Sequence, residues 1–175
     1  MEKMKKILIC VDVQEGFARS PQTREIANKI VNLTNKHYFD YIIATQFINK
    51  NRAFANIIKW NHLKNENEIK FVSGLRYDLV EKKHRYTCVD SKFIKILKTV
   101  NDEVIPTEVY ICGMDTDCCV YKIAIDLFER GIRPIIISDY CQSNGGSKSH
   151  TAGLTVLKRN IGGEQIKVLS DIIKH

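Results

Sequence analysis

The strongest constraint on the fold is the alternation of apolar runs and amphipathic segments along the second half of the chain. Three short segments are rich in consecutive apolar residues, as expected of strands: 108–113 (EVYICG), 133–138 (RPIIIS) and 165–169. Between them lie helix-like segments at 116–130, followed by Gly131, and at 147–160, followed by Gly162. Strands that are apolar throughout are typical of a parallel sheet covered by helices on both faces.

The first half of the chain repeats this alternation less clearly. Its predicted strands are 5–13 (KKILICVDV), 40–47 (DYIIATQF) and 79–81, the last leading into Lys83. Its predicted helices are 22–36, a short one near 53–60, and 91–99 with Ser91 as the N-cap. Asn/Lys-rich stretches make the segment from 48 to 76 hard to interpret. We therefore predict one domain over residues 1–175, a three-layer αβα fold with a parallel, Rossmann-like sheet of about six strands.

Composition limits the class of protein. A chain of 175 residues that is 44% hydrophobic suits one globular domain. It has no apolar run near the roughly 20 residues that a membrane span needs. The N-terminal apolar stretch is interrupted by Asp12 and lacks a small-residue cleavage site, so we expect no signal peptide and a cytoplasmic location. The six cysteines are then expected to be free thiols, with Cys10, Cys112 and Cys141 as buried hydrophobic residues.

The net charge of +7 raises the question of nucleic-acid binding. The lysines are scattered, and the sequence contains no zinc-finger spacing, aromatic RNA-binding strand or continuous basic helix. We expect a lysine-rich solvated surface, with no nucleic-acid or membrane partner.

Three chemically reactive residue types follow predicted strands. Asp12 ends the first strand, Lys83 follows the third, and Cys118 and Cys119 follow the strand at 108–113. Ligands in such folds bind at the carboxyl ends of the strands, so these residues are expected to converge. A helix start and an ammonium group favour a thiolate, and a carboxylate can take and return the thiol proton. Individually, Asp12 could instead cap a loop, and Lys83 could belong to the exposed run KKHR at 82–85.

Other chemistries find less support in the sequence. The five histidines lie far apart with no HxxxH or DxH pair, and a zinc site at Cys118 and Cys119 would need a second ligand pair. The C-x5-R signature of phosphatases, the P-loop and GxGxxG are all absent. We therefore predict no metal and no cofactor.

The two adjacent cysteines are distinguished by helical geometry. At about 100° per residue, the apolar stripe of the helix beginning at 116 centres near Val120 and Ala124. Cys118 then lies opposite the stripe, whereas Cys119 lies beside its edge. This favours Cys119 as the residue held against the protein body.

Three stretches of the chain resemble the isochorismatase-like cysteine hydrolase superfamily, which includes nicotinamidases and related amidases. ILICVDVQEGF at 7–17 resembles its DxQ-x-x-F motif, and VEKKHRYT at 80–87 resembles its K-x-x-Y-[ST] motif. The stretch that begins VYICGMDTDCCV at 109 resembles its G-x-x-T-D-x-C-V motif. The order and strand context match over nearly the whole chain.

The resemblance implies roles for particular residues. Asp12, Lys83 and Cys119 match the family's catalytic triad, whereas Cys118 falls on a variable position. A cis peptide bond is implied between Met114 and Asp115, with the backbone N–H groups of Asp115 and Cys119 forming an oxyanion hole. Gln14 and Phe17 are implied to line the substrate pocket.

The implied reaction is acyl transfer through a thioester on Cys119, with Asp12 as general acid and base and Lys83 as electrostatic activator. The expected substrate is a small amide or carbamoyl compound, and a homo-oligomer (dimer or tetramer) is implied. Nicotinamidases carry a metal-binding DxH motif after the second strand, where this chain reads TQFINKNRAF. The alternatives are a metal-dependent nicotinamidase, a redox sensor that uses Cys118 and Cys119, or a non-enzymatic binding protein.

Overall fold

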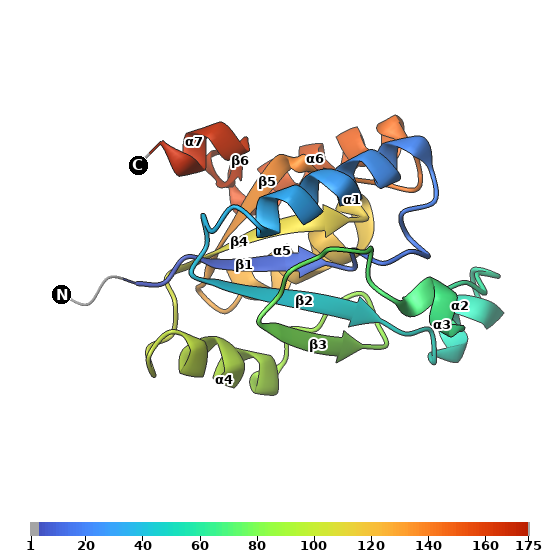
Figure 1. Ribbon diagram of the computed structural model, residues 1–175, viewed down its shortest axis with the longest axis horizontal. Coiled ribbons are helices and arrows are strands. Elements are labelled where there is room, and N and C mark those ends of the chain that lie inside the picture. Colours follow the sequence, from blue (N-terminus) through green and yellow to red (C-terminus); the bar gives the residue numbers. More distant parts are fainter. Residues whose placement is uncertain (1–3, 175) are drawn as a thin grey trace.

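A computed structural model describes residues 4–174, so the predicted domain ends at 1 and 175 lie outside the described residues. It shows a parallel six-stranded sheet in the order β3-β2-β1-β4-β5-β6 (Figure 1). The strands are β1 (Ile7–Val11), β2 (Tyr41–Phe47), β3 (Leu79–Lys83), β4 (Glu108–Met114), β5 (Arg133–Gln142) and β6 (Ile166–Lys167). The helices are α1 (Pro21–Thr34), α2 (Arg52–Asn56), α3 (Glu66–Ile69), α4 (Ser91–Val100), α5 (Tyr121–Phe128), α6 (Ser147–Ile161) and α7 (Leu169–Ile173), with a π-helical turn η1 (Thr116–Val120) and a 3-10 turn η2 (Gly163–Gln165). The predicted three-layer α/β fold is confirmed.

Each face of the sheet has its own apolar core. Along β1, Leu8 and Cys10 face the core that α1 and α7 cover, whereas Ile7 and Ile9 face the core covered by α4, α5 and α6. All five β1 side chains are buried. This burial on both faces explains why the strands read as continuous apolar runs rather than as alternating ones. No helix within residues 4–174 is long and apolar enough to cross a membrane.

The element ends correct several sequence predictions. The N-cap of α4 is Asp90 rather than Ser91, because the Asp90 carboxylate accepts a hydrogen bond from the N–H of Phe93. The predicted last strand at 165–169 shortens to Ile166–Lys167, and residues from Leu169 form α7 instead. β5 extends four residues beyond its predicted end at 138.

The strand order reverses between β1 and β4. From β1 the chain builds one half of the sheet through β2 and β3, and from β4 it builds the other half. The carboxyl ends of the strands lie at one edge of the sheet, on the right in Figure 1. Gly113 has a φ of +124°, and a Cβ there would collide with the backbone oxygen of Val11, so β1 and β4 approach closely only because this residue is glycine. The reversal point in such sheets is the usual ligand site.

Candidate active site

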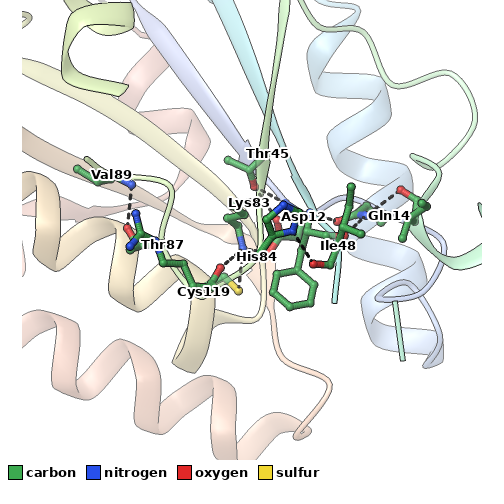
Figure 2. A network of polar contacts seen from close by, with 12 residues as sticks. Asp12, Gln14, Thr45, Ile48, Lys83, His84, Thr87, Val89 and Cys119 are labelled. Carbon is green, nitrogen blue, oxygen red and sulfur yellow. Dashed lines mark hydrogen bonds and ion pairs between the residues drawn. The ribbon is translucent and has the colours of Figure 1, made fainter. Parts of the chain in front are cut away.

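The structure brings Asp12, Lys83 and Cys119 together at this edge of the sheet. The Lys83 Nζ lies 2.7 Å from Asp12 Oδ2 and 3.3 Å from Cys119 Sγ. Asp12 is fully buried, and Lys83 and Cys119 are each 4% exposed. Figure 2 shows the lysine side chain reaching both partners. The ammonium group thus bridges a carboxylate and a thiol that lie 107 positions apart in the chain.

Asp12 is positioned by the end of β1 and by Thr45 of β2. Its φ of +51° lies in the left-handed region, which aspartate tolerates better than most residues and which ends the strand. The Thr45 hydroxyl donates to Asp12 Oδ1 at 2.6 Å and accepts from the Asp12 N–H at 3.0 Å. With Lys83 on Oδ2, both carboxylate oxygens have a buried partner. Thr45 was not identified from the sequence, where it is one β-branched residue in an apolar strand.

The electrostatics of the site hold the lysine charged and the thiol neutral. Burial opposes the charge on Lys83, but the nearby Asp12 and Cys119 outweigh it and raise the pKa of the ammonium. Burial raises the pKa of the Cys119 thiol well above its usual range, and contact with Lys83 only partly opposes this. Lys83 does lower the pKa of Cys119, as predicted, but desolvation of the buried sulfur outweighs this effect, so the net shift is upward.

Cys119 lies in a π-helical turn rather than in the regular helix predicted for 116–130. The N–H groups of Cys118 and Val120 both donate to the Asp115 carbonyl oxygen, at 3.1 and 3.2 Å. The Met114–Asp115 peptide bond is cis, as predicted. Cys119 is buried against the protein, whereas Cys118 is partly exposed, and burial beside Asp117 raises the pKa of Cys118 to about 12. The predicted distinction between the two cysteines is confirmed in their burial.

A cavity of about 200 Å³ opens onto Cys119. Its walls are mainly aromatic and apolar, formed by Phe17, Phe47, Phe54, Ile58, Trp60 and Tyr86. Its polar lining comes from Arg19, Asp115, Cys118, Cys119 and Asn144. The rings pack on one another, with Phe17 stacked on Trp60 at a centroid distance of 5.9 Å. The cavity therefore suits a small ligand with an apolar or planar part.

The two predicted pocket residues occupy different places. Phe17 lines the cavity, but Gln14 is fully buried and is not among the described residues that line it. The Gln14 amide donates to the carbonyl oxygens of Phe47 and Ile69 and accepts from the Phe47 N–H. Gln14 thus fixes the end of β2, where Phe47 forms part of the cavity wall, and does not itself face a ligand.

Several cavity residues were not identified from the sequence. Phe54, which is buried, and Trp60, which is partly buried, come from the segment at 48–76, whose polar composition gives no sign of them. Tyr86 is the tyrosine of the K-x-x-Y stretch, which could have indicated its position. Asn144 belongs to a turn sequence (SNGG) that indicates only a loop.

The residues near the cavity do not form a metal site. Within residues 4–174 there is no cluster of three or more His, Cys, Asp or Glu side chains that could hold an ion. At the end of β2 and just beyond it, where nicotinamidases carry their metal-binding motif, Phe47 and Phe54 form part of the cavity wall. His62 instead contacts the Glu68 carboxylate at 3.1 Å. The donor set therefore does not fit a metal-dependent mechanism.

Comparisons with known proteins place the chain in a family. No curated protein matches it. Among solved structures it is similar to a nicotinamidase from Bacillus subtilis, with 22% identity over 91% of this chain and 97% of that chain and a TM-score of 0.73. A pyrazinamidase of Pyrococcus horikoshii in complex with zinc shows 22% identity, 90% and 96% coverage and a TM-score of 0.74. An isochorismatase-like hydrolase from Alkaliphilus metalliredigens shows 19% identity, 89% and 92% coverage and a TM-score of 0.74.

These structures share the fold, and a family model identifies the family itself. The model for the isochorismatase domain matches residues 6–168, which includes every strand of the sheet and all three residues of the buried Asp–Lys–Cys cluster. The chain belongs to the isochorismatase family of hydrolases.

Proposed function

We propose that this protein is a cysteine hydrolase that cleaves the C–N bond of a small amide or carbamoyl compound. The observation that carries the proposal is the Lys83 ammonium, bonded to the Asp12 carboxylate and the Cys119 sulfur beside a cavity with aromatic walls. A carboxylate base, a cation and a thiol in one buried cluster are the groups that nucleophilic acyl transfer needs. Similarity to a nicotinamidase and a pyrazinamidase, whose names denote amide hydrolysis, supports this class of substrate.

The first half of the proposed reaction forms a thioester. Asp12 takes the proton of the Cys119 thiol, and the thiolate forms beside the Lys83 ammonium, which offsets its charge. The sulfur attacks the substrate carbonyl carbon, and the carbonyl electrons move onto the oxygen. Backbone N–H groups of Asp115 and Cys119 are proposed to donate to that oxyanion. Protonated Asp12 then gives its proton to the leaving nitrogen as the C–N bond breaks, which leaves an acyl group on the sulfur.

The second half of the reaction releases the acid. A water molecule enters in place of the amine and gives a proton to Asp12 as its oxygen attacks the thioester carbonyl. When the C–S bond breaks, the proton returns to the sulfur, and the site regains its resting thiol. The raised pKa of Cys119 is consistent with this cycle, because it makes the thiol the stable resting form between turnovers.

Substitution of the two adjacent cysteines tests the proposal. Wild type, Cys119→Ala and Cys118→Ala are assayed with a panel of small amides, ureas and carbamoyl compounds, with and without a chelator. We expect Cys119→Ala to lower kcat by about a thousandfold or more, and Cys118→Ala to stay within a few-fold of wild type. Mass spectrometry after iodoacetamide treatment with a substrate analogue present or absent gives a second readout, with protection expected at Cys119.

Equal loss of activity in the two variants would contradict a single nucleophile. Loss of activity on chelation would favour a metal-dependent reaction and would contradict the mechanism proposed above.

A further inference from the structure

Asp115 introduces a carboxylate into the cavity that the proposed reaction does not use. Asp115 lines the cavity, and the proposed reaction assigns a role only to its backbone N–H. Asp115 directly follows β4 and is the N-cap of η1, the turn that contains Cys119. The two residues are therefore neighbours within one turn of the chain. A charged group in this place needs an explanation, because the other walls are mainly aromatic.

The Asp115 carboxylate is held in place through one oxygen. Its Oδ1 accepts two hydrogen bonds from Asn144, from the backbone N–H at 3.0 Å and from Nδ2 at 2.8 Å. No hydrogen bond joins Oδ2 to any protein donor in the part of the chain that the structure describes. The turn after β5 therefore fixes the carboxylate and leaves its second oxygen available.

The protein does not neutralise this charge itself. Arg19 lines the same cavity, but no ion pair joins it to Asp115 among residues 4–174. Burial raises the pKa of Asp115 to about 6, since the hydrogen bonds from Asn144 only partly offset the loss of solvent and Asp117 and Asp12 add repulsion. A ligand that brings a donor hydrogen or a positive charge would relieve this unfavourable state.

We propose that Asp115 is a specificity-determining residue, whose Oδ2 selects amide substrates that carry a donor nitrogen, either an ammonium or a neutral N–H, on the acyl side of the scissile carbonyl. The inference rests on the proposed function only in taking this cavity as the substrate site. The aromatic walls hold the apolar or planar part of the substrate, and their faces also attract an ammonium group. Asn144 acts as the positioning residue that aims the carboxylate.

Three matched ligands test the proposal by binding alone. All three carry the same carbonyl and NH2 leaving group and differ on the acyl side of the carbonyl. 3-Phenylpropanamide has a CH2 group there and no donor; benzylurea replaces that CH2 by N–H; phenylalaninamide carries an ammonium on that carbon. Dissociation constants are measured by calorimetry in the Cys119→Ala variant, which removes the nucleophile and allows no thioester to form. The same measurements are made with Cys119→Ala/Asp115→Asn. Cys119→Ala/Asp117→Asn is the control, because Asp117 is also acidic and nearby but does not line the cavity.

We expect at least one donor ligand to bind Cys119→Ala about tenfold or more tightly than 3-phenylpropanamide, as for a hydrogen bond to a charged group. Asp115→Asn is isosteric but presents an NH2 donor in place of Oδ2, so the preference should vanish or invert, whereas Asp117→Asn should retain it. Preference for phenylalaninamide alone would identify an ammonium substrate, and preference for both donor ligands a neutral N–H. Melting curves of each variant confirm folding.

Equal affinity for the three ligands, a preference that survives Asp115→Asn, or no binding of any of them would overturn the inference. If the binding preference depends on Asp115 but the wild-type protein hydrolyses no amide, the proposed function would be overturned and this inference would stand.

Discussion

The buried pair of Lys83 and Asp12 predicts a large and specific loss of stability when the lysine is removed. The two side chains are 2% and 0% exposed, and their charged atoms lie 2.7 Å apart. At an effective dielectric constant of about 20, their Coulomb attraction is about 6 kcal/mol, and part of it offsets the cost of removing both charges from water. Lys83→Met leaves Asp12 buried without its cation, which costs about 3–5 kcal/mol.

The assay is urea unfolding at pH 7, followed by circular dichroism. Lys82→Met is the matched control, because Lys82 is the preceding residue of β3 and is exposed. Its change should stay within about 0.5 kcal/mol. The double variant Asp12→Asn/Lys83→Met removes both charges and should recover at least about 2 kcal/mol relative to the sum of the single changes. If Lys83→Met proves no more destabilising than Lys82→Met, the pair is not a buried ionic interaction, and the electrostatic account of the site is wrong.

Two further predictions concern the turn that contains Cys119. A Cβ on Gly153 of α6 would lie 2.9 Å from the backbone N and Cα of Asp117. Gly153→Ala should therefore lower the free energy of unfolding by about 1–3 kcal/mol and also lower kcat. Gly163 has open space around it, so the control Gly163→Ala should leave both quantities nearly unchanged in unfolding and activity assays. The folded pKa of Asp115, about 6, lies above its ordinary value of 3.8 because of burial and repulsion from Asp117 and Asp12, so ionisation opposes folding. Wild type should therefore lose stability relative to Asp115→Asn as the pH rises from about 4 to 7, by on the order of 2–3 kcal/mol, and parallel unfolding curves across that range would contradict this account.

The sheet could be predicted well from the sequence because each strand is indicated by a pattern within a few consecutive residues. Runs such as EVYICG are apolar on both faces, and a buried parallel strand is the structure that requires this pattern. The Asp–Lys–Cys cluster could also be predicted, since Asp12, Lys83 and Cys119 each lie at or after a strand end, and parallel strands bring such positions to one edge.

The features that were missed depend on contacts between distant segments. Whether Cys119 ionises depends on how completely the packed structure encloses its sulfur, and no sequence pattern reports that quantity. Trp60 becomes a cavity wall through packing against Phe17, which lies 43 positions away. Asp90 rather than Ser91 caps α4, although both residue types are good caps, because the backbone enters the helix one residue earlier than the apolar periodicity suggests.

The buried amide of Gln14 makes the backbone beside the Asp–Lys–Cys cluster independent of the side chains that line the cavity. It bonds only backbone groups, at Phe47 and Ile69, so it fixes the path of the chain whatever side chains those positions carry. The cavity walls at Phe54, Ile58 and Trp60 lie in the segment between these two anchored points. Substitutions at these three positions should therefore change the shape of the cavity, while the carboxylate, ammonium and thiol keep the positions that the sheet gives them.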